Sequence, residues 1–394
     1  MYPDLSYILH ALIGTQPDNA FSIVKTFGLL LVLAILTAAF ILDREVRRKE
    51  KEGLFKPVKI KIITGQPATL MDMLLNALLG FALGFKFFYI ISNFSDFQID
   101  PADIILSGKG NWPAGLILAA IFAGLKWWEK DKQKLDKPQE KLVAVYPHDR
   151  IGDITVLAAI SGVIGAKLFA IGEDLDLLLS GQVSFSEFIG QLLSGSGLAI
   201  YGGLIVAFFV VFFYLRRKGI PPIHFMDAVA PALIVSYGVG RMGCHLSGDG
   251  DWGIASDLAD RPSWLSWSPD WLWSFNYPHN VLERGQAIAD CTWRYCKELE
   301  NGVYPTSVYE FVMTLIIGLI LWSLRKRIKI PGMLFFIYLI FNGMERFWIE
   351  KIRINDRYDV MGFQTTQAEF IAVILMIAGV IGCVFLWQRS RKAT

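Results

Sequence analysis

Charged residues are scarce in this sequence, and their scarcity argues against a soluble globular protein. Only 19% of the 394 residues are charged, whereas 54% are hydrophobic. Soluble domains average about 25% charged residues. Apolar runs long enough for a membrane-spanning helix, which needs about 20 residues, recur along the chain. The composition therefore predicts an all-α polytopic membrane protein.

Cysteine and histidine are also rare, which narrows the chemistry. The chain has four cysteines and five histidines, and it contains neither a CxxC pair nor an HExxH motif. Without such motifs, no metal and no cofactor is predicted. Residues 1–20 lack the basic region and the apolar run of a cleavable signal peptide, so the first apolar helix is expected to direct insertion.

Lys and Arg are distributed unequally between successive loops, which predicts the topology. Residues 43–61 are densely basic, whereas residues 173–197 contain acids and no Lys or Arg. Because basic loops stay in the cytoplasm, the N-terminus is expected outside and the C-terminus inside. Hydropathy predicts about nine transmembrane helices, near 21–42, 70–92, 112–128, 151–171, 198–215, 225–245, 308–324, 331–350 and 368–387.

Two helix pairs resemble each other in sequence. Gly84, Lys86 and Phe88 of the first correspond to Gly165, Lys167 and Phe169 of the second, and the segments from Gly115 and Gly203 both read Gly-Leu-Ile. The pattern indicates either a duplicated helical hairpin or two small-residue pairs that are alike by composition. Both lysines lie within apolar helices, so both are expected to have carboxylate, carbonyl or lipid-phosphate partners.

The stretch from Tyr237 to Gly253 combines an arginine with an unusual density of glycine. Arg241 follows an apolar segment, at a depth where a charge is costly without a partner or a task. It is either an anchor that marks the helix end or part of a binding site. Glycines at 238, 240, 243, 248 and 250 leave room for a bulky ligand, which favours a pocket for an anionic head group.

A non-membrane arm is expected at residues 254–304, on the outer side. Its tryptophans indicate a subdomain at the lipid interface or, alternatively, one that grips a peptide. Cys291 and Cys296 lie in this arm, and a turn between them would allow a disulfide.

Charged residues gather again near the outer ends of two later helices. Ser307 and Glu310 fit a capping box at a helix start. Arg346, Glu350 and Arg353 have the spacing of one helical face, and together with Glu345 they are either an ion-paired helix end or a functional cluster that converges with Arg241.

Four motifs resemble those of the prolipoprotein diacylglyceryl transferase family. YGGLI at 201–205 resembles the family's HGGLI, and GRMGCHLSGDGDWG at 240–253 resembles GRxGNFxNGE with a following WG. YPTSVYE at 304–310 resembles HPSQLYE, and FNGMERFWIEKIRIND at 341–356 resembles YGxFRFxxExxRxPD. The resemblance covers residues 20–42 and 150–390, and it leaves 70–128 as an extra hairpin.

The chain departs from the family at several motif positions. Tyr201 replaces the histidine, Cys244 the asparagine, Phe27 a first-helix tyrosine and, with a one-residue insertion, Asp249 the glutamate. The matching charged residues are Arg241, Arg346, Glu350 and Arg353.

The resemblance implies an enzyme of the bacterial inner (plasma) membrane that acts in lipoprotein biosynthesis. Such an enzyme transfers diacylglyceryl from phosphatidylglycerol to the lipobox cysteine of a preprolipoprotein, forming a thioether and releasing glycerol phosphate. Fixed guanidinium groups stabilise the charge on a phosphate leaving group, so Arg241 and Arg346 are expected to hold the lipid phosphate. Tyr201 would lie beside the reacting carbon, with His245 or Asp249 as proton acceptor. The expected substrate-binding residues are Gly202, Gly203, Cys244, Asp249, Tyr309, Glu310, Glu350 and Arg353.

A second hypothesis is a non-catalytic lipid-binding or transporter-like protein of the same fold, suggested by the repeated hairpin and the intramembrane lysines. Under either hypothesis the expected segments are a lead with the first helix and basic loop (1–69), the extra hairpin and its loop (70–149), the core hairpin and signature helix (150–253), the arm (254–304) and the C-terminal helices (305–394).

Overall fold

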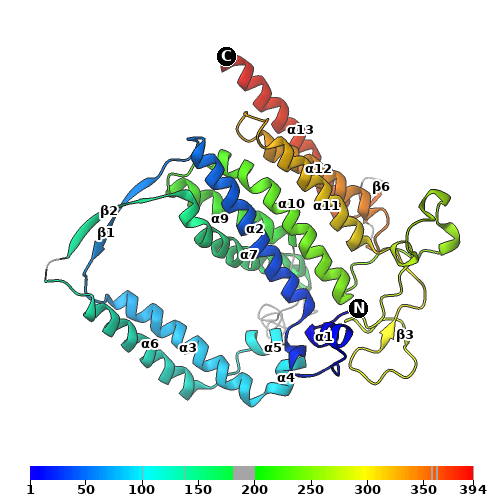
Figure 1. The fold of residues 1–394 in the computed structure, drawn as a ribbon, viewed down its shortest axis with the longest axis horizontal. Coiled ribbons are helices and arrows are strands. Elements are labelled where there is room, and N and C mark those ends of the chain that lie inside the picture. The colour runs from blue at the N-terminus through cyan, green and yellow to red at the C-terminus, as the bar shows by residue number, and fades with distance from the viewer. Residues whose placement is uncertain (100, 137, 181–199, 356–357, 361–362, 394) are drawn as a thin grey trace. The chain divides into compact units, whose positions relative to one another are not determined.

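The computed structural model describes residues 1–394 except 100, 137, 181–199, 356–357, 361–362 and 394 (Figure 1). The described chain is mostly helical and divides into two units. One unit comprises Met1–Phe55 and Ile220–Thr394, and the other is Lys56–Gly219.

Helix α10 (Pro222–Ser247) lies at the centre of the first unit. It packs against α2 (Thr26–Lys51), α11 (Thr306–Leu324) and α12 (Met333–Glu350), while α12 packs in turn against α13 (Gln367–Ala393). Glycine allows the close approach of α10 to α11, because a Cβ at Gly238 would collide with Thr314. A core of Ile234, Ile317, Leu321 and Leu334 joins α10, α11 and α12.

The second unit is two helix pairs and a two-stranded ribbon. Strand β1 (Val58–Thr64) pairs antiparallel with β2 (Gln139–Val145). Helix α3 (Leu70–Ser92) packs against α6 (Trp112–Lys132), and α7 (Ile151–Leu179) packs against α9 (Ile200–Arg217). The short helices α4 (Phe94–Ile99) and α5 (Pro101–Leu106) connect α3 to α6.

The two helix pairs of this unit make equivalent close contacts. A Cβ at Gly84 would collide with the carbonyl of Ala114, and a Cβ at Gly165 would lie 2.7 Å from the carbonyl oxygen of Gly202. These positions correspond in the sequence comparison, so the packing agrees with a duplication. Lys86 has the carbonyl partners expected of it, because its Nζ donates to the oxygens of Ile104 and Lys109, both at 2.9 Å.

Six helical segments of the described chain are long and apolar enough to cross a membrane. This confirms a polytopic helical membrane protein. Every span expected from the sequence overlaps a helix, including α6, α9 and α12, which are not among the six. The six segments are Thr26–Lys51, Leu70–Ser92, Pro147–Gly172, Pro222–Ser247, Thr306–Leu324 and Gln367–Lys392.

The segment between α10 and α11, which includes residues 254–304 and is called the arm below, has little regular structure. It contains the 3-10 turns Leu258–Asp260, Ser263–Leu265 and Asp270–Leu272, and β3 (Gln286–Ala287) pairs with β4 (Lys297–Glu298). Trp252, Tyr277 and Val303 form its core. A further antiparallel pair, β5 (Tyr358–Val360) and β6 (Phe363–Thr365), precedes α13.

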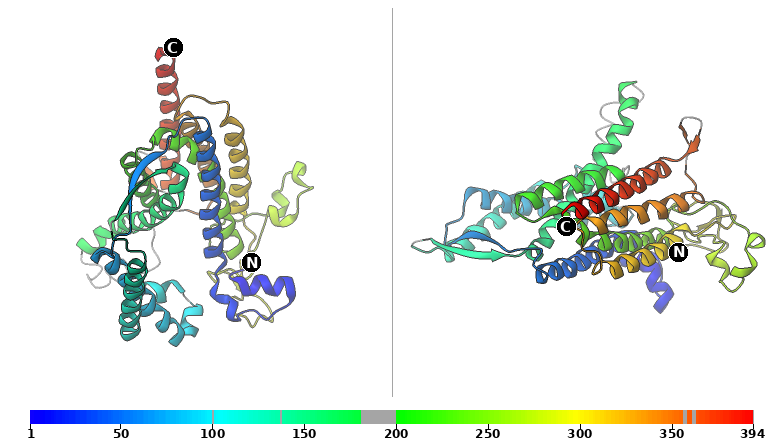
Figure 2. Two further views of the ribbon diagram at one scale, coloured as in Figure 1. Left: turned by 60° about the vertical axis from the view of Figure 1, so that its left-hand side comes forward. Right: turned by 90° about the horizontal axis from the view of Figure 1, so that it is seen from above.

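The N-terminal segment is docked on this arm, which the sequence did not predict. Figure 2 shows α1 (Leu5–Ile13) beside the arm. The Tyr7 hydroxyl accepts a hydrogen bond from the backbone N–H of Tyr295 at 3.2 Å, and the Met1 amino group donates to the Pro278 carbonyl at 2.6 Å. Residues almost three hundred positions apart (the first separation is 288) therefore stabilise each other.

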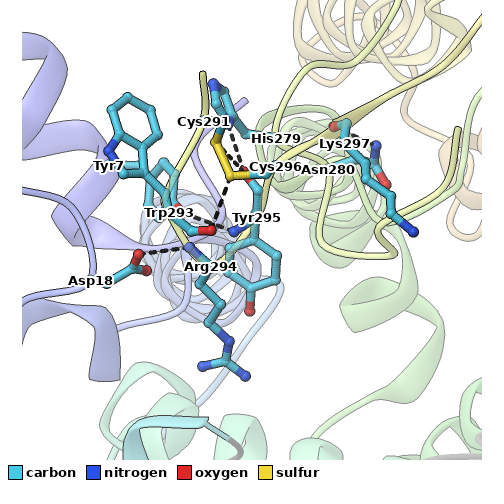
Figure 3. Close-up of a disulfide and its surroundings, with 10 residues drawn as sticks. All are labelled: Tyr7, Asp18, His279, Asn280, Cys291, Trp293, Arg294, Tyr295, Cys296 and Lys297. Atoms are coloured by element: carbon cyan, nitrogen blue, oxygen red, sulfur yellow. Dashed lines mark hydrogen bonds between the residues drawn. A yellow bond between two sulfur atoms is a disulfide. The ribbon is translucent and has the colours of Figure 1, made fainter. Parts of the chain in front are cut away.

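Cys291 and Cys296 form a disulfide, with their Cα atoms 5.6 Å apart (Figure 3). The bridged alternative expected from the sequence is therefore confirmed. The Trp293 ring inside the bridged loop packs edge-on against Tyr7 at 5.7 Å and against His10 at 4.9 Å. The disulfide therefore closes the loop whose Trp293 side chain packs against α1.

Replacing both bridged cysteines by serine is expected to destabilise the docked arm without blocking membrane insertion. Closing a loop this short stabilises the folded protein by about 2 kcal/mol, because it lowers the conformational entropy of the unfolded chain. The variant should therefore unfold at a lower temperature in detergent. Peptide mapping without reductant should show the linked pair in the unmodified protein. Alkylation of both thiols in unreduced protein would contradict the bridge.

Candidate functional site

Arg241 is buried on α10, with 8% of the residue exposed, and it carries two ion pairs. Its Nη2 donates to Glu310 Oε1 at 2.7 Å, and its Nε faces Glu310 Oε2, so the two side chains meet side by side. Its Nη1 pairs with Asp251. Arg241 is therefore a buried cation with two carboxylate partners and not a snorkelling anchor.

Arg353 reaches the same two acids from the other end of the chain. Helix α12 ends at Glu350, and Arg353 follows it in a bridge with Gly253. Its Nη1 donates to Glu310 Oε1 at 3.3 Å, and its Nη2 pairs with Asp251. Positive and negative side chains alternate in the charged cluster formed by Arg241, Asp251, Glu310 and Arg353. Of the charges that were expected to converge with Arg241, Arg353 therefore joins it, whereas Arg346 pairs with Glu350.

Glu310 is the centre of this charged cluster, and the expected capping box is wrong. Helix α11 begins at Thr306, after Pro305, and no side chain caps it. The Glu310 side chain is 0% exposed, and it also accepts a hydrogen bond from the Tyr237 hydroxyl at 2.5 Å. Two buried guanidinium groups compete more strongly for this carboxylate than a backbone N–H at a helix start does.

Asp251 is the member of the cluster that was not predicted from the sequence. Its side chain is 29% exposed, and its carbonyl oxygen accepts from Thr306 Oγ1 at 2.8 Å and Ser307 Oγ at 3.1 Å. Burial alone would raise the pKa of Asp251, but the guanidinium groups of Arg241 and Arg353 bring that pKa down to about 2. Asp251 is therefore ionised at neutral pH.

Cys244 and Asp249 lie next to the charged cluster. Arg241 Nη1 is 3.6 Å from Cys244 Sγ, and Asp249 Oδ1 is buried without a hydrogen-bond partner among the described residues. Burial raises the pKa of Asp249, and the charge of Asp251 adds to the effect. One donor atom from each of Cys244, Asp249 and Asp251 lies within 4.8 Å of the others, which is close enough to hold a metal ion. Arg241 already contacts two of these residues, so a cation there would meet its positive charge.

His245 and Tyr309 point to the arm and not to the charged cluster. Nδ1 of His245 is 3.2 Å from the Tyr277 hydroxyl, and the imidazole packs against Phe275 and Trp271. The Tyr309 hydroxyl donates to the Leu272 carbonyl at 2.5 Å. Both side chains therefore hold the arm against the membrane helices.

The end of α12 contains a second group of charges. Arg346 Nη2 pairs with Glu350 Oε2 at 3.0 Å, as the i, i+4 spacing predicts. Arg353 does not continue this face, because the helix has ended and its side chain turns to Glu310. Glu345 is 1% exposed, and neither of its oxygens has a hydrogen-bond partner among the described residues.

The Tyr201 segment belongs to the other unit of the chain. Tyr201 lies in the first turn of α9, and its side chain is outside the described part of the structure. A Cβ at Gly203 would lie 2.7 Å from the Gly162 carbonyl, and one at Gly202 would collide with Phe169. The two glycines therefore let α9 pack closely against α7.

Comparison with known proteins extends these observations. A family model described as prolipoprotein diacylglyceryl transferase matches residues 111–385, from the start of α6 into α13. A phosphatidylglycerol–prolipoprotein diacylglyceryl transferase of Corynebacterium diphtheriae is 25% identical over 246 residues, covering 62% of this chain and 80% of the relative. A relative of the same name from Streptococcus sanguinis is 27% identical over 304 residues, covering 75% and 98%. One from Streptococcus equi subsp. zooepidemicus is 26% identical over 286 residues, covering 72% and 92%.

Proposed function

The chain belongs to the prolipoprotein diacylglyceryl transferase family, and we propose that it moves diacylglyceryl from phosphatidylglycerol to the thiol of a preprolipoprotein cysteine. The relatives it matches over most of their length carry that activity in their names. The geometric support is the charged cluster, in which Arg241 and Arg353 both pair with Asp251, whose side chain is 29% exposed.

The reaction forms one S–C bond and breaks one C–O bond. The thiol sulfur attacks the glyceryl carbon, the electron pair of the C–O bond passes to the phosphate oxygen, and glycerol phosphate leaves. Negative charge grows on that oxygen, so guanidinium groups in a site with little water would lower the barrier. We assign this role to Arg241 and, from the family pattern, to Arg346. The thiol proton passes to a base, for which Asp249 is the better candidate because His245 is engaged by the arm.

The finer membrane arrangement is also part of the proposal. The helices α6, α9 and α12 would complete about nine spans, with the N-terminus outside and the C-terminus in the cytoplasm. This topology places the charged cluster and the arm at the outer surface of the bacterial plasma membrane. Trp264 and Trp267, which are 72% and 77% exposed, would lie in the lipid interface.

Tyr201→Phe is expected to slow transfer by about ten- to a hundredfold, as for the loss of one hydrogen bond to a charged group. A phenol is protonated at neutral pH, so we assign Tyr201 a donor role toward the glycerol or the leaving oxygen. Tyr201→His, which restores the family residue, should retain activity. Initial rates with a precursor peptide provide the measurement. A nearly inactive Tyr201→Phe would instead indicate a base, and an unchanged rate would remove Tyr201 from the site.

Complementation tests the proposed function directly. Cells depleted of their own diacylglyceryl transferase should grow and accumulate lipid-modified lipoprotein when this chain is expressed. The second hypothesis, a lipid-binding or transporter-like protein, predicts no modification. It is disfavoured because the relatives are named as transferases. In addition, the proposed topology gives the two similar hairpins the same orientation, without the inversion common in transporters.

A further inference from the structure

Asp251 is held between two arginines in the way that a phosphodiester would be. One oxygen of its carboxylate pairs with Arg241 and the other with Arg353. A phosphodiester also offers two anionic oxygens in a fork, and guanidinium groups bind such forks well. The Asp251 carboxylate therefore pairs with the two cations that a lipid phosphate would bind.

The two acids of the charged cluster differ in how easily they could be replaced. Glu310 is 0% exposed, lies on α11 and has Tyr237 as an additional donor. Asp251 is 29% exposed and lies in the loop after α10, where Gly250 has a φ of +97°. Each arginine therefore has one buried partner and one partner at the edge, and an entering anion would meet the edge partner first.

We propose that Asp251 occupies the phosphate position of the site and is displaced when the phosphodiester of the substrate binds to Arg241 and Arg353. This inference rests on the proposed function, and it adds Arg353 to the groups that contact the lipid phosphate. The movement is confined to the side chain, because Thr306 and Ser307 hold the Asp251 carbonyl and the neighbouring Trp252 is buried.

Such a device has two physical consequences. It keeps the two arginines paired while the phosphate is elsewhere, since an unpaired buried cation is strongly destabilising. It also weakens phosphate binding, because the anion has to displace a carboxylate that is already in place. Removing the Asp251 charge is therefore expected to tighten anion binding, whereas removal of an ordinary structural partner would loosen the site.

The test compares Asp251→Asn with the unmodified protein, both as the full chain in detergent. Calorimetric titration with glycerol phosphate and with dihexanoyl-phosphatidylglycerol should give about tenfold lower dissociation constants for the variant. The KM for phosphatidylglycerol should fall in parallel. Asp260→Asn is the matched control, because it removes the same charge from an exposed position on the arm and should leave both dissociation constants unchanged.

A second variant guards against a folding failure. Asp251→Glu keeps the charge, but its longer side chain fits less well between the arginines, so binding should again tighten. Binding that is unchanged or weaker in both variants overturns the inference. Titration measures binding without turnover, so it also separates this inference from the proposed function. If the Asp251 variants bind these anions more tightly than the unmodified protein but the unmodified protein transfers no lipid, only the proposed function is overturned. Tightening for glycerol phosphate but not for the lipid would assign the site to a free phosphate and overturn displacement by substrate.

Discussion

Arg241→Ala is expected to reduce lipid transfer by about a hundredfold or more. Losing a guanidinium from a desolvated phosphate site removes roughly 3 kcal/mol of transition-state stabilisation. Arg241 is the cation in this site that meets both acids and the Cys244 sulfur, so Arg353 alone cannot replace it. Initial rates with a preprolipoprotein peptide and phosphatidylglycerol would provide the measurement.

Two further variants separate chemistry from folding in this experiment. Arg241→Lys keeps a positive charge but cannot bind two acids at once, so it should restore activity only partly. Arg284→Ala removes an exposed arginine from the arm and should have no effect on the rate. All variants should insert into the membrane in similar amounts. Near-normal modification by Arg241→Ala would refute the assigned role.

The helices were the most predictable part of the molecule. Long apolar runs specify a helix in the membrane because every backbone group must be hydrogen-bonded within the segment. Helix α10 was expected at 225–245 and is observed at Pro222–Ser247, and α3 was expected at 70–92 and is observed there. Helix ends were less predictable. The first span was expected to end at 42, but α2 continues to Lys51, because its charged last turns carry local ion pairs such as Arg48 with Glu45 and Glu52.

The contacts of the site were only partly predictable. The family pattern selected Arg241, Glu310 and Arg353, which the structure brings together. It placed Asp249 at the glutamate position of the motif and did not reveal that Asp251 joins the two arginines, because the two acids lie on either side of Gly250 and the motif does not fix their side chains. The sequence signal that could have indicated Asp251 is the pair of glycines after α10. Gly248 and Gly250 both have positive φ, and the turn that they form leads the chain to the bridge between Gly253 and Arg353.

The capping box at Ser307 and Glu310 failed for a related reason. The capping-box pattern considers only a few neighbouring residues, whereas Arg241, which binds Glu310, lies 69 residues away in the sequence. A local hydrogen bond to a backbone N–H is worth about 1 kcal/mol, and breaking a buried ion pair costs several times more. The tertiary contact therefore decides the orientation of this side chain.

Glu310→Ala is accordingly expected to be the most destabilising single substitution in the charged cluster. Removing this carboxylate leaves Arg241 and Arg353 to share Asp251, and it takes the acceptor from the Tyr237 hydroxyl. Leaving a buried charge without its partner costs about 3–5 kcal/mol. Thermal unfolding in detergent should show a lowered midpoint, and protein yield in membranes should fall.

The charge of Glu310, and not its volume, should account for most of this loss. Glu310→Gln preserves the shape of the side chain, and the glutamine can still accept hydrogen bonds, but the negative charge is lost. This variant should therefore be destabilised almost as strongly as Glu310→Ala. Glu300→Ala, an exposed position on the arm, serves as the matched control and should unfold like the unmodified protein. If the ion pair is the cause, combining Glu310→Gln with Arg353→Gln should cost less than the sum of the two single changes, because the double variant removes the cation that was left unpaired. Strict additivity of the two changes would show that Glu310 and Arg353 stabilise the protein independently, and it would contradict the cluster as a coupled unit.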